Sequence, residues 1–304
     1  MKGRTKGLLF VFVTALISGV SIFLNKFGVS GFDPFVFTSV KNLFVGLMLF
    51  SGLLLTTRMR ELKTLKSTQW KKLVGIGFIG GSIPFLLFFA GLQMASAPVA
   101  AFIHKTMVVW VALLGFVFLK EKLSKKQVLG IGALMAGLVF FSGISPSMGI
   151  GELMVFAATL FWAGEMVLSK HMLKDVSPLT VMWSRMFFGS FVLVAFLALT
   201  GRLPGVLALS GAQWSWIVLT SVFLLGYVFT FYSGLKLVKA SEAAGVLLLG
   251  SLITTVLSWG FFGAVPSLTE VFGGFIIVLG ISMLSLRLKL PKEVVPSASP
   301  YQQK

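Results

Sequence analysis

The chain has 304 residues, of which 57% are hydrophobic and only 12% charged, whereas soluble domains carry about 25% charged residues. It has no cysteine, which excludes disulfides, thiolate nucleophiles and cysteine metal sites. The net charge of +17 does not indicate nucleic-acid binding, because the basic residues lie in short segments between apolar runs rather than on one surface. We therefore expect an all-α integral membrane protein without a separate soluble domain.

Apolar runs near the length of about 20 residues that a helix needs to cross a bilayer recur along the whole chain. The first run follows a basic start, as in a signal peptide, but it is as long as a span and no small-residue cleavage site follows it, so we expect it to be retained. After the last run, residues 289–304 are polar and contain prolines, which predicts a disordered cytoplasmic tail. In chain order the runs predict ten transmembrane helices, at residues 7–27, 34–56, 71–93, 97–119, 126–144, 150–170, 178–200, 213–235, 243–263 and 267–287.

The distribution of basic residues predicts the orientation of these spans. Ten spans put both termini on one side of the membrane, and 21 of the 26 lysines and arginines lie on that side. The positive-inside rule then places both termini in the cytoplasm. Three basic residues fall inside predicted spans instead, namely Lys41, Lys105 and Arg185.

The chain also matches itself at a shift of 144 residues, which becomes 143 after Trp70 and Trp214. In this register basic residues, prolines and glycines coincide, and such matches are more informative than apolar ones in an apolar chain. The pairs are Lys26 with Lys170, Pro34 with Pro178, Lys41 with Arg185, Gly130 with Gly273 and Gly137 with Gly280. The sequence therefore predicts a five-helix repeat at residues 1–144 and a second at 145–288. Because five is odd, the second repeat enters the membrane from the opposite side, as in secondary transporters with inverted repeats.

The paired patterns Lys26…Pro34…Lys41 and Lys170…Pro178…Arg185, together with the segments GLQMASAPVAAF, GLKLVKASEAAG and FLKEKLSKKQVLGIGALMAG, resemble the EamA-type branch of the drug/metabolite transporter superfamily. The resemblance implies a central cavity between the two halves, alternating access, no ATP hydrolysis and no cofactor. It implies a small-molecule substrate such as an amino acid or organic anion, with export as the expected direction. One departure is that Lys120-Glu121 of the first half corresponds to Gly263-Ala264 of the second.

Lys105 is the first candidate for substrate binding. It lies about 12 Å along its span, where an ionised side chain costs at least about 2.5–3.5 kcal/mol unless it faces a cavity, a partner or water. Its counterpart in the second repeat is Leu248, so the fold itself does not require a charge there. We predict that Lys105 binds an anionic substrate group, with His104 as a second donor or a proton-titrating site; the alternative is that both are structural.

Glu165 is the one acid well inside a predicted span, and Arg185 lies at a similar depth on the next span. The two are therefore expected to form an ion pair. Either this pair only braces the two helices, or Glu165 is a proton-coupling carboxylate whose proton affinity depends on Arg185. The sequence leaves both interpretations open.

Three further residues are candidates for the site. Trp162 precedes Glu165 by three residues and so shares its helix face, which suggests a place in the substrate cavity. Lys41 either binds carbonyls at a helix end or attracts anions to the outer mouth. Pro84 follows a Gly-Gly pair and is predicted to kink the third span, as in the moving parts of transporters.

Enzyme signatures such as GxSxG, a Walker-type glycine loop or HExxH do not occur, so we do not expect an enzyme. The main hypothesis is a secondary transporter in the inner (plasma) membrane of a prokaryote, whose partners are its substrate and the lipid bilayer, with proton coupling and either a monomeric or a homodimeric state left open. Alternatives are an exchanger of phosphorylated or nucleotide-linked metabolites, which usually needs several cations, and a channel or scramblase.

Overall fold

The computed structural model describes residues 2–28, 32–56, 58–95, 97–142, 149–263 and 265–285. The predicted tail at 289–304 lies outside these residues. Within the described ranges the regular secondary structure is helical: α1 (Lys2–Gly28), α2 (Pro34–Leu55), α3 (Met59–Thr64), α4 (Ser67–Gly81), α5 (Ile83–Leu92), α6 (Ala97–Lys105), α7 (Met107–Leu119), α8 (Lys125–Ser142), α9 (Ile150–Met172), α10 (Pro178–Leu199), α11 (Pro204–Leu207), α12 (Gly211–Leu237), α13 (Ala240–Leu247), α14 (Leu249–Phe262) and α15 (Leu268–Ser285).

Nine of the predicted spans appear as helical segments long and apolar enough to cross a membrane. Among the described residues these segments are Gly3–Asn25, Pro34–Leu55, Ser67–Leu92, Val99–Leu119, Ile150–Met172, Pro178–Leu199, Gly211–Leu237, Ala240–Phe262 and Leu268–Ser285. The fifth predicted span, 126–144, corresponds to α8, which has 18 residues and begins with two lysines. The count of ten spans stays a prediction that depends on α8.

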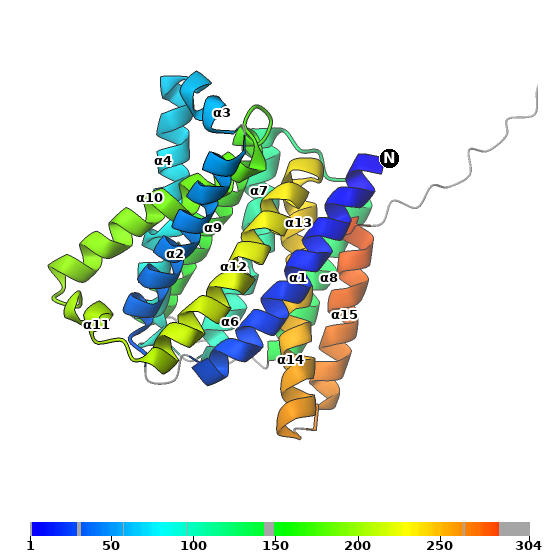
Figure 1. The fold of residues 1–304 in the computed structure, drawn as a ribbon. Coiled ribbons are helices and arrows are strands. Elements are labelled where there is room, and N and C mark those ends of the chain that lie inside the picture. Colours follow the sequence, from blue (N-terminus) through cyan, green and yellow to red (C-terminus); the bar gives the residue numbers. More distant parts are fainter. Residues whose placement is uncertain are drawn as a thin grey trace, which may run out of the picture.

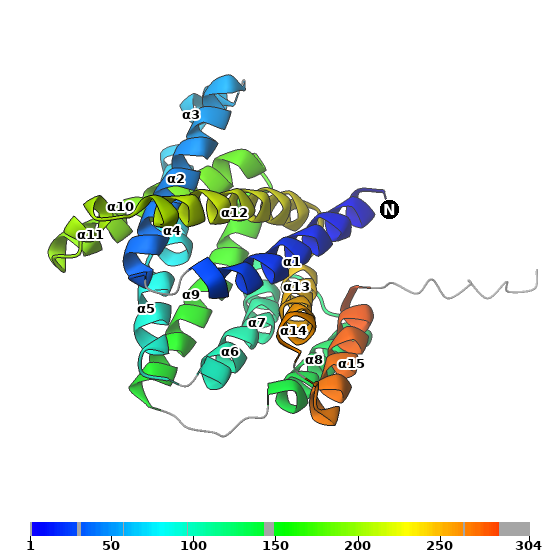
Figure 2. The same cartoon turned by 60° about the horizontal axis from the view of Figure 1, so that its bottom comes forward.

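The helices run between two ends of one bundle. We call the end at which α1 begins the N-terminal end; α3 also lies there, at the top of Figure 1, whereas α11, the last turn of α14 and the first turn of α15 lie at the opposite end. In both views α10 and α11 are on one side of the molecule and α8 and α15 on the other (Figures 1 and 2). Between them, α1 packs on α12 and α14, and α9 packs on α5 and α7.

The contact between α8 and α15 is made through glycines. A side chain added at Gly137 would place its Cβ 2.8 Å from the carbonyl oxygen of Gly273, and one at Gly130 would place it 2.9 Å from that of Gly280. Small residues of this kind let helices approach closely in lipid, where contact between backbones replaces the hydrophobic effect as a source of attraction. The glycines that match in the sequence therefore form one tight helix pair.

The third span is interrupted, as the sequence predicts, close to Pro84. α4 ends at Gly81 and α5 begins at Ile83, while Ser82 between them has φ −142° and ψ −74°, outside the helical region. Proline lacks the N–H that would bond to the carbonyl of Gly80 in a continuous helix. Two further interruptions, at Thr106 between α6 and α7 and at Leu248 between α13 and α14, have no proline and were not predicted.

Glu61 on α3 ties the N-terminal end of α10 to the preceding helices. Its carboxylate accepts hydrogen bonds from the backbone N–H of Ser177 (2.7 Å), the Ser177 hydroxyl (2.6 Å) and the Thr180 hydroxyl (2.8 Å). Burial acts to raise the pKa of Glu61, but the hydrogen bonds from Ser177 and Thr180 and the charge of Arg58 outweigh it, so that the pKa lies below its ordinary value of 4.5. The ionised carboxylate therefore stabilises the folded protein.

We predict that this contribution is complete above about pH 4.5 and is lost as the pH falls through the lowered pKa of Glu61. Glu61→Gln should lower the apparent unfolding temperature of the detergent-solubilised protein at about pH 7, and the gap to the wild type should narrow as the pH falls below about 4.5. The measurement is thermal unfolding of both proteins across this pH range. A gap of constant size would show that the charge of Glu61 is not responsible.

Candidate functional site

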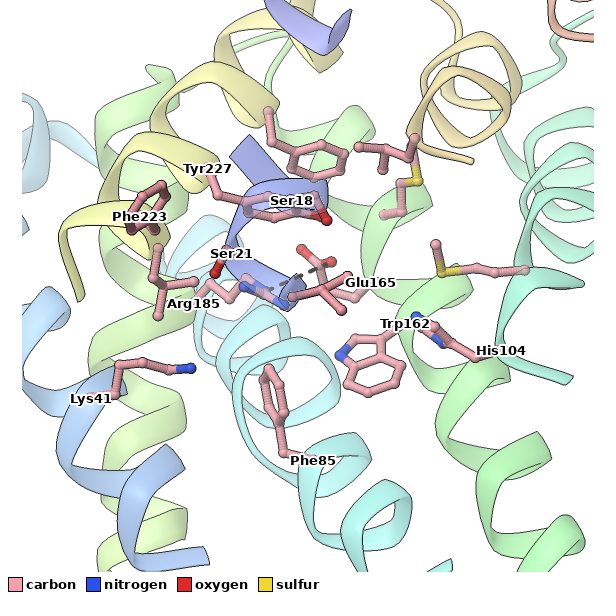
Figure 3. A pocket seen from close by; sticks show the side chains of 16 residues that line it. Ser18, Ser21, Lys41, Phe85, His104, Trp162, Glu165, Arg185, Phe223 and Tyr227 are labelled. Carbon is pink, nitrogen blue, oxygen red and sulfur yellow. Dashed lines mark ion pairs between the residues drawn. The ribbon is translucent and has the colours of Figure 1, made fainter. Parts of the chain in front are cut away.

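A cavity of about 280 Å³ lies inside the bundle, and helices from both halves of the chain line it (Figure 3). This volume is at the lower end of the roughly 300–1,000 Å³ typical of small-molecule sites. Its charged lining residues are Lys41, Glu165 and Arg185. The uncharged lining side chains include aliphatic and methionine side chains, but most of them are aromatic or are serines. These aromatic and serine residues are Ser18, Ser21, Phe85, His104, Trp162, Phe223, Tyr227 and Phe231.

Glu165 is almost fully buried and bound by hydroxyl groups. One carboxylate oxygen, Oε1, accepts hydrogen bonds from the hydroxyls of Ser169 (2.5 Å) and Tyr232 (2.7 Å). The side chain comes from the middle of α9, and its residue is 3% exposed. Two hydroxyl donors compensate much of the cost of burying a carboxylate.

Arg185 on α10 approaches the other carboxylate oxygen of Glu165. Its Nε lies 3.9 Å from Oε2, so the sequence-predicted partners lie side by side (Figure 3), although the distance is long for a hydrogen bond. Nε is buried and has no hydrogen-bond partner in the described part of the chain. The guanidinium also lies 5.9 Å from the centre of the Phe85 ring, and Nη1 lies 3.7 Å from the sulfur of Met186. Among the residues that the structure describes, no carboxylate oxygen thus lies within hydrogen-bond distance of the Arg185 guanidinium.

Lys41 on α2 supplies a second cation to the same cavity. Lys41 and Arg185 each lie seven residues after the proline that begins their helix, about 10 Å along it, and α2 and α10 start from opposite ends of the bundle. The Lys41 ammonium lies 4.5 Å from the centre of the Phe37 ring. With one acid and two cations, the charged side chains on the cavity walls have a net positive charge.

His104 and Trp162 pack together on the wall formed by α6 and α9. Their ring centres are 4.8 Å apart with an interplanar angle of 68°, and Phe88 lies 5.4 Å from each ring. His104 Nδ1 is buried and has no hydrogen-bond partner among the described residues. Both residues therefore line the cavity as predicted candidates, with His104 held by ring contacts rather than by a carboxylate.

The break near Pro84 determines the position of Trp162. The indole Nε1 of Trp162 donates a hydrogen bond to the carbonyl oxygen of Gly80 (3.2 Å), which is the acceptor that Pro84 cannot satisfy. Asn42 likewise donates from Nδ2 to the carbonyl oxygen of Gly81 (3.3 Å). Pro84 itself is buried and does not line the cavity, so its effect on the site is indirect.

Lys105 lies outside this cavity. Its ammonium is 5.4 Å from the centre of the Phe141 ring on α8, and it does not appear among the lining residues. Adjacent residues on a helix point about 100° apart, so that the helix turns Lys105 towards α8 while His104 faces Trp162. The depth that made Lys105 conspicuous in the sequence does not bring it to the cavity.

Several lining residues were not singled out from the sequence. Ser21 is the repeat counterpart of Glu165, so the internal register does point to its position. Phe85, Phe223 and Phe231 carry no such signal, because phenylalanine is common throughout the chain. No group of three or more metal-binding side chains occurs in the described residues.

We predict that Trp162→Phe destabilises the protein by about 1–3 kcal/mol, because it leaves the buried carbonyl of Gly80 without a donor. The loss should shrink in a Pro84→Ala background, since that substitution supplies a backbone N–H opposite the same carbonyl. Thermal unfolding of the two single variants and the double variant measures the coupling. Strictly additive losses would contradict this account of the break.

Comparison with known proteins agrees with this architecture. The model of the EamA-like transporter family matches the chain twice, at residues 5–143 and 149–286. The protein named uncharacterized transporter YyaM of Bacillus subtilis (strain 168) is 25% identical over 288 residues, covering 91% of this chain and 93% of its own. An uncharacterized transporter of Archaeoglobus fulgidus is 24% identical over 283 residues, covering 91% and 84%. One solved crystal structure has the same fold, with a TM-score of 0.76 at 18% identity over 92% of this chain and 96% of that chain. The resemblance seen in the sequence is thus confirmed, and the chain belongs to the EamA-like transporter family.

Proposed function

We propose that this membrane transporter is a secondary transporter of a small carboxylate-bearing metabolite, such as an amino acid or organic anion. The observation that carries the proposal is the cavity, which holds an arginine whose Nε lacks a hydrogen-bond partner among the described residues, together with a lysine, between aromatic walls. Export across the prokaryotic inner membrane is the direction we expect. The protein would work by alternating access, opening this cavity to one side of the membrane at a time.

Two observations support the inverted-repeat arrangement that alternating access uses. The family model matches the two halves of the chain separately. The helix contacts also recur with the halves exchanged: α1 packs on α12 and α14, and α9, its counterpart in the sequence register, packs on α5 and α7. In this arrangement α8 also crosses the membrane, as the fifth of ten spans, and both termini are cytoplasmic.

Arg185 and Lys41 are the anchors that we propose for the substrate, in place of Lys105. A guanidinium presents parallel N–H donors that match the two oxygens of a carboxylate. Because Glu165 already binds two hydroxyls and approaches Arg185 only at 3.9 Å, an incoming carboxylate can occupy the free donors of Arg185. The aromatic residues, including His104 and Trp162, would contact the apolar part of the substrate.

The size and charge of the cavity favour this substrate class over the alternatives. A cavity of about 280 Å³ suits a small metabolite better than a nucleotide-linked one. A phosphate group usually binds several cationic side chains at once. Only two cationic side chains of the described residues, Lys41 and Arg185, line this cavity, which favours a carboxylate over a phosphate. A channel would use rings of charge in symmetry-related positions. Lys41 and Arg185 are such counterparts, but Glu165 corresponds to the uncharged Ser21 in the other half.

We further propose that Glu165 is the proton-coupling residue. Its carboxylate lies 3.9 Å from Nε of Arg185 on the cavity wall, and the hydroxyls of Tyr232 and Ser169 hold it in place. Two further residues would affect the opening and closing of the cavity: Lys41 through its positive charge, and Pro84 through the helix break in the third span.

The anchor is tested by comparing two substitutions that each remove one positive charge. We predict that Arg185→Gln weakens binding of the best carboxylate substrate by at least about tenfold, or about 1.4 kcal/mol, whereas Lys105→Gln changes it by less than about twofold. A thermal-shift screen of purified protein against amino acids, organic acids and sugar phosphates identifies the ligand, and titration gives the affinities. If Lys105→Gln loses binding and Arg185→Gln does not, Lys105 and not Arg185 binds the substrate carboxylate.

The coupling role is tested in proteoliposomes. We predict that transport by the wild type responds to an imposed pH gradient, whereas Glu165→Gln still exchanges substrate between the two sides but no longer responds to the gradient, because the amide cannot titrate. Substrate counterflow, which needs no proton, is the control for folding and binding. Gradient-driven transport that persists in Glu165→Gln would exclude this residue as the proton carrier.

A further inference from the structure

A second hollow, of about 320 Å³, lies at the N-terminal end of the bundle and is lined mostly by charged side chains. Its charged residues are Arg4 on α1, Glu121 before α8, Lys170 on α9, and Lys239 and Glu242 at the start of α13. We call these five residues the end cluster. Lys170 follows Glu165 by five residues on α9, about 7–8 Å along the helix, so that the end cluster lies between the cavity and the N-terminal end.

Several hydrogen bonds of the end cluster connect the first half of the chain to the second. Arg4 donates to the carboxylate of Glu242 (2.8 Å) and to the carbonyl oxygen of Ser285 (2.5 Å) on α15. The carboxylate of Glu121 accepts from the backbone N–H of Ala240 (3.1 and 3.2 Å), at the N-terminus of α13. A helix N-terminus favours a carboxylate in this place.

Gln127 and Lys239 extend these connections. Gln127 on α8 donates to Glu242 (3.3 Å) and to the carbonyl oxygen of Leu284 (3.3 Å), and Lys239 donates to the carbonyl oxygen of Lys122 (2.5 Å). Glu242 is 1% exposed, which makes its bonds stronger than those of a surface pair. The contacts of Lys239, Ala240 and Glu242 have to break if the start of α13 moves away from α1, from the segment between α7 and α8 and from the start of α8.

The repeat register reproduces only one of these five charged residues, since Lys170 corresponds to Lys26. The counterparts of Arg4, Glu121, Lys239 and Glu242 are the uncharged residues Met148, Ala264, Ser96 and Val99. The end cluster is therefore a property of one end of the molecule, in a fold whose helix contacts otherwise recur with the halves exchanged.

We propose that the end cluster is a latch that holds the transport path closed at the N-terminal end, and that Glu121 and Glu242 are the residues that close it. This inference rests on the proposed function in one respect, namely that the cavity opens to the two sides in turn. Opening towards the N-terminal end then requires that Arg4 releases Glu242 and that α13 releases Glu121. Removing the two carboxylates shifts the population towards that open state.

The chain contains no cysteine, so a single introduced thiol reports on one position. Val238→Cys places the thiol at the hollow beside the end cluster, where Val238 is 3% exposed, and Ser21→Cys places it in the cavity. Each reporter is combined with Glu121→Gln/Glu242→Gln, which removes both charges and keeps the side-chain size. The control is Glu270→Gln, because Glu270 binds Ser267 of its own helix start at the opposite end.

We expect the double substitution to raise the rate of maleimide labelling at Val238→Cys by about tenfold or more. The rate at Ser21→Cys should change by less than about twofold, because alternating access exposes the cavity in both states. The control should change either rate by less than about twofold. An unchanged rate at Val238→Cys in a protein that elutes as a monodisperse species would overturn the latch. If the double variant does not fold, Arg4→Glu and the swap Arg4→Glu/Glu242→Arg replace it: the latch requires fast labelling in the first and restored slow labelling in the second, and equal rates in both overturn it.

Labelling requires no substrate, so the latch and the proposed transport can fail separately. Labelling that changes as expected, in a protein that transports none of the carboxylates tested, would retain the latch and reject the proposed substrate class. Transport of a carboxylate together with unchanged labelling would retain the function and reject the latch.

Discussion

The need to satisfy backbone hydrogen bonds away from water governs much of this structure. Inside a bilayer an unpaired carbonyl costs several kcal/mol, so a carbonyl that a helix interruption frees requires another donor. The break at Ser82 and Pro84 frees the carbonyls of Gly80 and Gly81, and these bind Trp162 and Asn42. The same indole packs against His104 on the cavity wall. The shape of the cavity is therefore fixed partly by a proline that does not touch it.

The negative and positive side chains of the cavity differ in how well their hydrogen-bonding groups are satisfied. The carboxylate of Glu165 is supplied with hydroxyl donors, whereas the nearby guanidinium has its Nε buried without a hydrogen-bond partner among the described residues. A buried donor of this kind is costly unless another group satisfies it at some stage of the working cycle. The carboxylate substrate that we propose is such a group. In that proposal the pair of Glu165 and Arg185 braces two helices and also takes part in transport, whereas the sequence offered a structural brace and proton coupling as separate alternatives.

The sequence predicted features that depend on position along the chain and missed features that depend on rotation about a helix axis. Nine spans follow from hydropathy, and the proximity of Glu165 to Arg185 follows from their equal depth on consecutive spans. Depth alone also favoured Lys105, but the packing of α6 against α8 and α9 turns it towards Phe141. The interruptions at Thr106 and Leu248 lack a proline or a glycine pair, so no local residue marks them. The capping of α13 by Glu121 joins residues far apart in the sequence and becomes visible only in the fold.

The pairing of α8 with α15 has a consequence for how such a molecule can evolve. These helices are counterparts in the sequence register, as are α2 and α10, and each is in contact with its own counterpart. Contacts between equivalent elements are the hallmark of a two-fold dimer of identical chains, in which any residue appears on both sides of the interface. Such a dimer cannot have a glutamate, as at Glu121, in one copy and an alanine at the equivalent position of the other. Joining the two copies in one polypeptide removes that restriction, so each half can change independently and the molecule can acquire a preferred direction.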